Sequence, residues 1–247
     1  MKDAPHRPDL ETYIRLREKH NVVPVWREVM ADLQTPVAAF LRLDPQPNGF
    51  LLESVEGGER WARYSFLGGD TFATVTARRG QIDVEGDPPV LPNDGESPLA
   101  YIRRLLEAFD APEMEELPPL HGGAVGFLGY DVVRELEVIG EEPDDDLGLP
   151  DAVLLLTRTF VVFDHLKQKA FVITNVATPG DPVASYREAQ ARCDEVVERL
   201  AAPLSLPQVE LELASEVAFE TSVDDAEYRG WVETAKEHVM AGDVFQV

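Results

Sequence analysis

The chain has 247 residues, and its 44% apolar content is typical of a globular protein with one large domain or two small ones. Its 46 acidic and 22 basic residues give a net charge of −24, so neither nucleic acid nor an anionic membrane surface is an expected partner. A single cysteine, Cys193, excludes an internal disulfide and any site made of several cysteines. The sequence shows no signal peptide and no apolar run that could span a bilayer, which predicts a cytoplasmic protein.

The first part of the chain predicts one helix followed by a series of strands. Residues 7–20 have apolar side chains at helical spacing, and Asp9 is placed to cap the start of that helix. Gly80 lies in RRGQ, which is typical of a hairpin turn. The predicted strands, separated by polar turns, are 22–30, 35–44, 48–56, 63–69 and 72–86.

The second part predicts helices on either side of a long β-hairpin. Ser97 and Pro98 begin a helix, Asp181 caps a second one, and Gly242 ends a third. A strand leading into a short helical turn is expected within 124–137. The hairpin pairs 152–165 with 168–178, and the three helices cover 98–110, 182–202 and 221–243.

This order of elements is not a strict alternation of strands and helices. It predicts an α+β fold of packed, largely antiparallel β-sheets with flanking helices. We expect an N-terminal domain over 1–205 and a second domain that begins at 221–247. The last residues, AGDVFQV, resemble the start of a new strand, so we expect the natural protein to continue beyond Val247.

Motif searches exclude several classes of site. The glycines of GGAVGFLG (122–129) have the wrong spacing for a dinucleotide-binding loop, and no phosphate-binding loop is present. The five histidines are scattered, and no pair has the spacing of metal ligands. We therefore predict neither a catalytic residue nor a metal ligand within this chain.

A polar group at the end of one apolar strand predicts a binding site. Glu53 and Ser54 follow Phe50, Leu51 and Leu52, and a carboxylate beside a hydroxyl is a good receptor for an ammonium group. Arg63 is then available for a ligand carboxylate, and a neighbouring apolar pocket would complete a site for an amino acid. The alternative from the residues alone is an internal Glu53–Arg63 pair, with Ser54 bonded to the backbone.

Several stretches in the same order resemble the large subunit (component I) of anthranilate synthase. In that family an LLES strand is followed by a return of the type R-Y-S-F, then by a GG-x-x-G segment ending in Y-D and V-R. The family's chorismate-binding domain opens on a strand similar to AGDVFQV. The matching stretches are LLESVEGGERWARYSFLGGD (51–70), GGAVGFLGYDVVRELE (122–137), LPDAVLLLTRTFVVFDH (149–165) and YRGWVETAKEHVMAGDVFQV (228–247).

The resemblance implies the first step of tryptophan biosynthesis, in which chorismate and glutamine-derived ammonia give anthranilate and pyruvate. It implies Mg²⁺ as the cofactor, a glutamine amidotransferase (glutaminase) subunit as the partner in a heterotetramer, and feedback inhibition by tryptophan. The implied tryptophan site contains Ser54, Glu53, Leu52 and Arg63. The family's catalytic residues, its Mg²⁺ ligands and a Pro-Tyr pair of the inhibitor pocket would all lie beyond Val247, so we expect 1–247 alone to be inactive.

Two other functions fit the sequence. The large subunit of aminodeoxychorismate synthase, an enzyme of folate synthesis, has a closely similar scaffold but makes a 4-amino product and releases no pyruvate. The second alternative is a non-catalytic regulatory or interaction module that ends near Val247.

Overall fold

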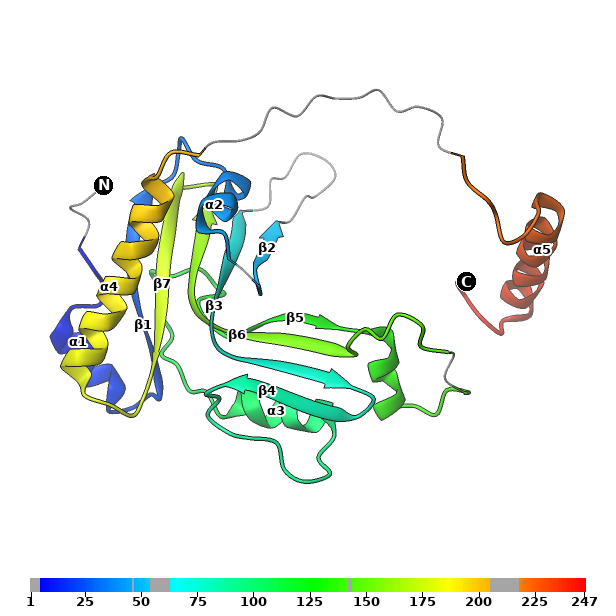
Figure 1. Cartoon of the computed structure of the whole chain (residues 1–247), viewed down its shortest axis with the longest axis horizontal. Coiled ribbons are helices and arrows are strands. Elements are labelled where there is room, and N and C mark those ends of the chain that lie inside the picture. The colour runs from blue at the N-terminus through cyan, green and yellow to red at the C-terminus, as the bar shows by residue number, and fades with distance from the viewer. Residues whose placement is uncertain (1–4, 46, 54–62, 142–143, 205–217) are drawn as a thin grey trace. The chain divides into compact units, whose positions relative to one another are not determined.

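The structure, a computed structural model, describes the chain except for residues 1–4, 46, 54–62, 142–143 and 205–217 (Figure 1). The chain divides into two compact units, Met1–Leu204 and Ser205–Val247. The first unit contains all the strands that the structure describes, joined in one seven-stranded sheet. The second unit contains helix α5, Asp225–Ala241, which begins after the N-cap Asp224 and ends at Gly242 in a left-handed conformation (φ 84°).

All the paired strands of the sheet run antiparallel. Their order is β1-β7-β6-β3-β2, with β4 added beside β3 and β5 added beside β6. The predicted α+β class with an antiparallel sheet and flanking helices is confirmed, although the strands form a single sheet. The bounds are β1 Val22–Met30, β2 Phe50–Glu53, β3 Tyr64–Arg78, β4 Gln81–Gly86, β5 Ala124–Leu128, β6 Ala152–Asp164 and β7 Lys169–Ala177.

Strands β3 and β6 are long enough to belong to two parts of the sheet, which we call the upper and lower tiers. They pair from Tyr64 opposite Asp164 to Ala77 opposite Ala152, with register shifts between Gly68 and Ala73. Figure 1 shows both strands bending between the tiers. The upper tier consists of β1, β7, β2, residues 64–68 of β3 and 159–164 of β6; the lower tier consists of β4, β5 and residues 73–78 and 152–156.

The helices begin where side chains satisfy their first backbone N–H groups. Asp9, Ser97 and Asp181 each accept a hydrogen bond from the backbone N–H three residues later, which confirms the helix starts predicted at these positions. Pro98 and Pro182 occupy the first position of their helices. The bounds are α1 Leu10–Arg17, α2 Pro36–Leu43, α3 Pro98–Glu107, the 3₁₀ helix η1 Tyr130–Glu135, and α4 Pro182–Ala201.

Two predicted strands are wrong. Residues 35–44 form α2, because Thr35 accepts a hydrogen bond from the Ala38 N–H at 3.2 Å and Pro36 takes the first helical position. The buried side chains of this helix, Ala39 and Leu43 among them, then recur at helical spacing. Residues 244–247 form no strand, and the part of their unit that the structure describes offers no strand to pair with.

The central strands of the upper tier, β7 and residues 159–164 of β6, are buried on both faces along most of their length. Helix α4 packs against β7 and β1, and α2 packs against α4 and β3. Val161 and Phe163 of β6 face these helices, together with Cys193 of α4. Phe160 and Val162 point to the other face, where they pack with Trp26. The interpretation of Cys193 as a packing residue is confirmed, since its side chain is fully buried and burial raises the pKa of its thiol to about 12.

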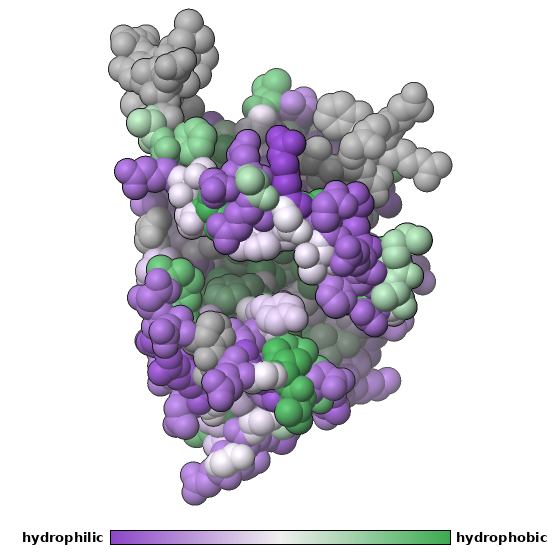
Figure 2. Space-filling view, turned by 90° about the vertical axis from the view of Figure 1, so that its right-hand side faces the viewer, coloured by the Kyte–Doolittle hydropathy of each residue, from purple (hydrophilic) through white to green (hydrophobic). Residues whose placement is uncertain are grey.

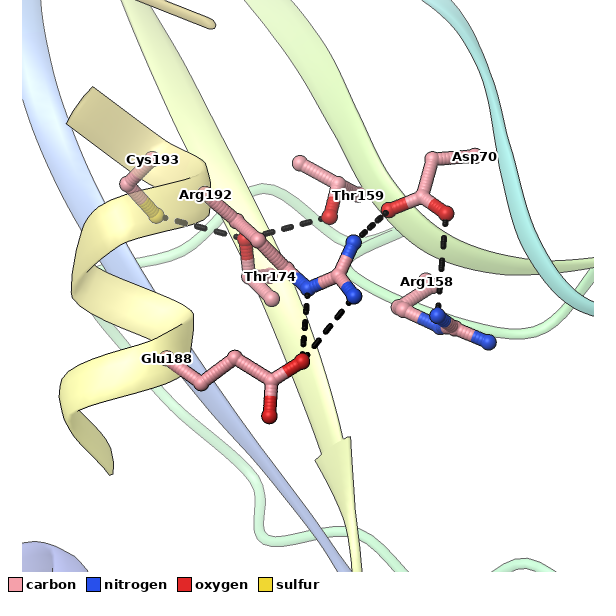
Figure 3. A network of polar contacts seen from close by, with 7 residues as sticks. All are labelled: Asp70, Arg158, Thr159, Thr174, Glu188, Arg192 and Cys193. Carbon is pink, nitrogen blue, oxygen red and sulfur yellow. Dashed lines mark hydrogen bonds and ion pairs between the residues drawn. The ribbon is translucent and has the colours of Figure 1, made fainter. Parts of the chain in front are cut away.

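A network of polar side chains joins the bend of the sheet to α4 (Figure 3). Asp70, where the register shifts, accepts a hydrogen bond from Nη1 of Arg192 at 3.3 Å and lies 3.9 Å from Nη1 of Arg158. Arg192 also contacts Glu188, one turn earlier on α4. These contacts hold both tiers to one helix, because Asp70 lies between them.

The described surface mixes charged and apolar side chains. Figure 2 shows a face on which hydrophilic residues predominate and hydrophobic residues come to the surface between them. The exposed apolar side chains of the lower tier lie on β5 and around η1, and include Phe127, Leu128, Tyr130 and Leu136. No described helix has both the length and the apolar content needed to cross a membrane.

Candidate functional site

Strand β2 presents two of the predicted site residues at the edge of the upper tier. Leu52 pairs with Phe66 and Glu53 pairs with Ser65, so their side chains leave the strand on opposite faces. Glu53 is exposed, and 43% of Leu52 is accessible. β2 is the terminal strand of the main order and pairs with β3 alone among the described strands. Ser54 lies outside the described residues, and its predicted role stays a prediction.

Arg63 is held by a carboxylate at the adjacent end of β6. Its Nε and Nη2 donate to the two oxygens of Asp164 at 3.3 and 3.0 Å, and the guanidinium lies 4.7 Å from the centre of the Tyr64 ring. The side chain of Asp164 is 2% exposed, whereas that of Arg63 is 42% exposed. The ion pair described for Arg63 is therefore with Asp164 rather than with Glu53, and it fixes the position of a cation that solvent can reach.

The protonation equilibria of this pair favour the charged forms. Burial raises the pKa of Asp164, but hydrogen bonds from Arg63 and the Lys167 N–H, with the charges of both residues, outweigh burial and lower it. The hydrogen bond to Asp164 raises the pKa of the Arg63 guanidinium. The pair therefore stays ionised at neutral pH, and the cation can receive a second anion such as a carboxylate.

A buried serine and a histidine lie beside this pair. Ser65, 3% exposed and directly opposite Glu53, is 2.7 Å from Nε2 of His165 through its Oγ. The ring of His165 stacks near that of Phe163, with centroids 6.3 Å apart. Burial of Ser65 leaves its hydroxyl unsuited to attack a substrate, so the contact acts as a support for the end of β3. Glu53, Arg63, Asp164 and His165 lie at the same end of the sheet, and we call this set the upper rim. Strand register places Glu53 on the face of Ser65 and Asp164 on the opposite face, with Tyr64.

The sequence alone does not reveal the roles of Asp164 and His165, which end the first predicted strand of the hairpin, 152–165. The signal that finds them is register: once β3 and β6 are paired antiparallel, Tyr64 falls opposite Asp164. That pairing needs a contact between segments about a hundred residues apart, which local patterns do not contain.

The segment GGAVGFLGYDVVRELE (122–137) has a structural explanation. Arg134 donates through Nε to Asp131 at 2.7 Å and through Nη1 to the carbonyl of Ile139 at 2.8 Å, so this pair closes the turn after η1. At Gly126 a Cβ atom would lie 1.8 Å from the carbonyl oxygen of Val153. Only glycine therefore allows β5 to approach β6 at this point.

The described residues do not fit a magnesium ion. No group of three or more histidine, cysteine, aspartate or glutamate side chains among them is arranged to hold a metal. The acidic residues Asp144, Asp145 and Asp146 lie in an exposed loop, where Asp145 is paired with Arg78 and Arg79. No chemical step through a metal is assigned to this part of the chain.

Comparison with known proteins defines the class. The family model described as chorismate binding enzyme matches residues 55–247. The chain therefore belongs to the family of chorismate binding enzymes.

The relatives with similar sequences described here are all named anthranilate synthase component 1 or I. Anthranilate synthase component 1 of Acetivibrio thermocellus is 33% identical over 97% of this chain and 50% of its own length. The protein of that name from Acinetobacter calcoaceticus is 36% identical over 92% of this chain and 46% of its own. The crystal structure of anthranilate synthase component I from Streptococcus pneumoniae TIGR4 matches with a TM-score of 0.56 and 28% identity, over 87% of this chain and 46% of that one. The chain thus spans about half the length of the curated relatives it matches, and the predicted resemblance is confirmed.

Proposed function

We propose that this chain is part of the large subunit of an anthranilate synthase, a cytoplasmic enzyme of tryptophan biosynthesis. The whole subunit converts chorismate and ammonia to anthranilate, pyruvate and water. The observation that carries the proposal is the identity of 33% and 36%, over more than nine tenths of the chain, to proteins named anthranilate synthase component 1. Residues 1–205 form the inhibitor-binding domain, and 221–247 begin the chorismate-binding domain.

The proposal includes a tryptophan site at the upper rim. The exposed carboxylate of Glu53 receives the ammonium group of the amino acid, beside the hydroxyl of Ser54. The Arg63 guanidinium, fixed by Asp164, attracts the carboxylate. Leu52, which is 43% exposed, lies on the same face of the sheet as Asp164 and on the opposite face from Glu53, so the proposed ligand lies across the end of β2 to meet both. A zwitterionic amino acid would then meet one charge of each sign, in a protein whose net charge of −24 otherwise repels anions.

The proposal also includes two components that this part of the chain does not supply. The relatives' name, component 1, supports a second component, and we assign the release of ammonia from glutamine to that subunit, in a heterotetramer. Magnesium would be bound outside the described residues, since none of them form a metal-binding group. The ion would neutralise carboxylate charge on chorismate.

The test is an assay of the protein at the full length of its relatives, purified with its glutaminase subunit. With chorismate, Mg²⁺ and either glutamine or ammonium, we expect anthranilate fluorescence and an equal amount of pyruvate from a lactate dehydrogenase coupling. Residues 1–247 alone serve as the control and should give neither product. A 4-amino product without pyruvate would contradict the proposal in favour of an aminodeoxychorismate synthase, and the absence of any turnover would favour a non-catalytic module.

A further inference from the structure

The C-terminal ends of α2 and α4 are joined by two arginines, one from each helix. Nε of Arg42 on α2 donates to the carbonyl oxygen of Ala202 at 2.8 Å, and Nη2 of Arg199 on α4 donates to the carbonyl oxygen of Leu43. The last carbonyl groups of a helix lack partners within the helix and lie at the negative end of its dipole. Each arginine therefore completes the end of the other helix, and we call this pair the arginine clamp.

The clamp acts on the segment that leads from α2 into β2. A Cβ atom at Gly69 would lie 2.6 Å from Cβ of Pro45 and 3.0 Å from the carbonyl oxygen of Asn48, so this segment lies directly against the bend of β3. Strand β2 begins just after it, with Phe50 opposite Gly68. The end of α2 therefore helps to fix where β2 begins.

Helix α4 also holds the bend directly. Nη1 of Arg192 donates to Asp70 at 3.3 Å (Figure 3). Arg199 follows roughly two turns later on the same helix. Both arginines line a cavity of about 280 Å³, together with Pro45 and Gly69. The α2–β2 segment, the bend of β3 and the last turns of α4 therefore form one packed group around this cavity.

This packed group connects two parts of the protein that have different proposed roles. Strand β2 ends with Leu52 and Glu53 of the proposed tryptophan site. Helix α4 ends beside α2, and the chain then continues from Leu204 into the second unit (Figure 1). Because the same two hydrogen bonds hold both helix ends, a displacement of β2 that opens the clamp also releases the end of α4.

We propose that the arginine clamp transmits tryptophan binding at β2 to the chain that follows α4, and so to the chorismate-binding domain. Arg42 and Arg199 are positioning residues in this scheme, because they make the position of β2 depend on that of the end of α4. The inference rests on the proposed tryptophan site and adds the contact through which that site acts. A ligand shifts an equilibrium only through contacts that differ between two states, so the clamp is closed in one state and rearranged in the other.

The experiment measures how strongly chorismate and tryptophan weaken each other's binding to the full-length enzyme with its glutaminase subunit. Glutamine and ammonium are left out, so that no turnover occurs. Calorimetry gives the dissociation constant of tryptophan with and without saturating chorismate, and the ratio of the two is the coupling factor. We expect a factor of about ten or more in the wild type. Arg42→Met and Arg199→Met should each reduce it about three-fold or more, because each removes one hydrogen bond of the clamp.

Controls separate transmission from stability. Arg199→Lys keeps a charged donor for a single carbonyl oxygen, so its coupling factor should stay within about two-fold of the wild type. Arg187→Met, at an exposed position on the same helix, should leave the coupling factor unchanged. Hydrogen exchange of the wild type tests the same inference without a variant: tryptophan should slow amide exchange in α2 and β2 and also in residues 198–204.

The outcomes distinguish this inference from the proposed function. If tryptophan does not bind to the wild type, the proposed site is wrong and the inference falls with it. If tryptophan binds and inhibits, but both methionine variants keep the wild-type coupling factor, the proposed function stands and the clamp does not transmit binding. Slower exchange in α2 and β2 that does not extend to 198–204 would also overturn the inference.

Discussion

The two tiers of the sheet share strands β3 and β6 but are buried differently. In the upper tier, every residue of β6 from Thr159 to Asp164 is buried, because helices cover one face and loops and strands pack on the other. In the lower tier, β6 is less buried: Val153 and Leu154 are partly exposed, whereas Ala152, Leu155 and Leu156 are buried. Strand β6 therefore changes from complete to partial burial across the bend of the sheet.

This difference explains where the candidate functional groups lie. The upper rim lies at the ends of strands whose interiors are packed. Arg63 is fixed there by Asp164, whereas Glu53 is exposed at the end of β2.

The largest expected effect is a lower free energy of unfolding when a side chain in the core of the upper tier is truncated. Leu67→Ala in the upper tier removes a side chain with 0% exposure, and we expect a loss of about 3–4 kcal/mol in the free energy of unfolding. Leu154→Ala makes the same change in the lower tier, where the side chain is only partly buried, and should cost about 1–2 kcal/mol. Urea unfolding followed by circular dichroism measures both values. Equal losses in the two variants would contradict the comparison of the tiers.

A smaller effect, dependent on pH, is expected in the lower tier. A hydrogen bond from Arg104 on α3, then one from the Asn93 N–H, lower the pKa of Glu96 from 4.5 to about 2. Because the folded pKa is depressed, this stabilisation is complete above about pH 4.5 and is lost as the pH falls towards 2.

Glu96→Gln should therefore lower the urea midpoint at pH 7 and have a much smaller effect on it near pH 2. Glu107→Gln, at an exposed position on α3, is the control. A Glu96→Gln effect of the same size at both pH values would show that the ion pair with Arg104 does not stabilise the fold through charge.

Local patterns predicted those elements whose signals are short in sequence. The hairpin of β6 and β7, the helix starts at Asp9 and Asp181, and the helix end at Gly242 all follow from capping groups or continuous apolar runs. Helix α2 differs from its prediction because its apolar run is typical of a strand, whereas Thr35 and Pro36 form a helix-capping signal.

The site was only partly predictable for a different reason. Glu53 and Arg63 stood out as polar residues beside apolar runs, but Asp164 joins Arg63 only through strand register. The buried side chain of Asn175 looks like any strand asparagine in the sequence, and its burial depends on the segment at Gly122 that packs against it. Contacts between distant segments decided both cases.

The most direct test of the account is tryptophan inhibition of the full-length enzyme carrying Glu53→Gln, which keeps the shape of the side chain and removes its charge. If the upper rim binds the ammonium group of the inhibitor, the inhibition constant should rise at least ten-fold while turnover of chorismate without tryptophan stays the same. The control variant Arg15→Ala, at an exposed position on α1, should have the same inhibition constant for tryptophan as the wild type. An unchanged inhibition constant in Glu53→Gln would contradict the proposed site.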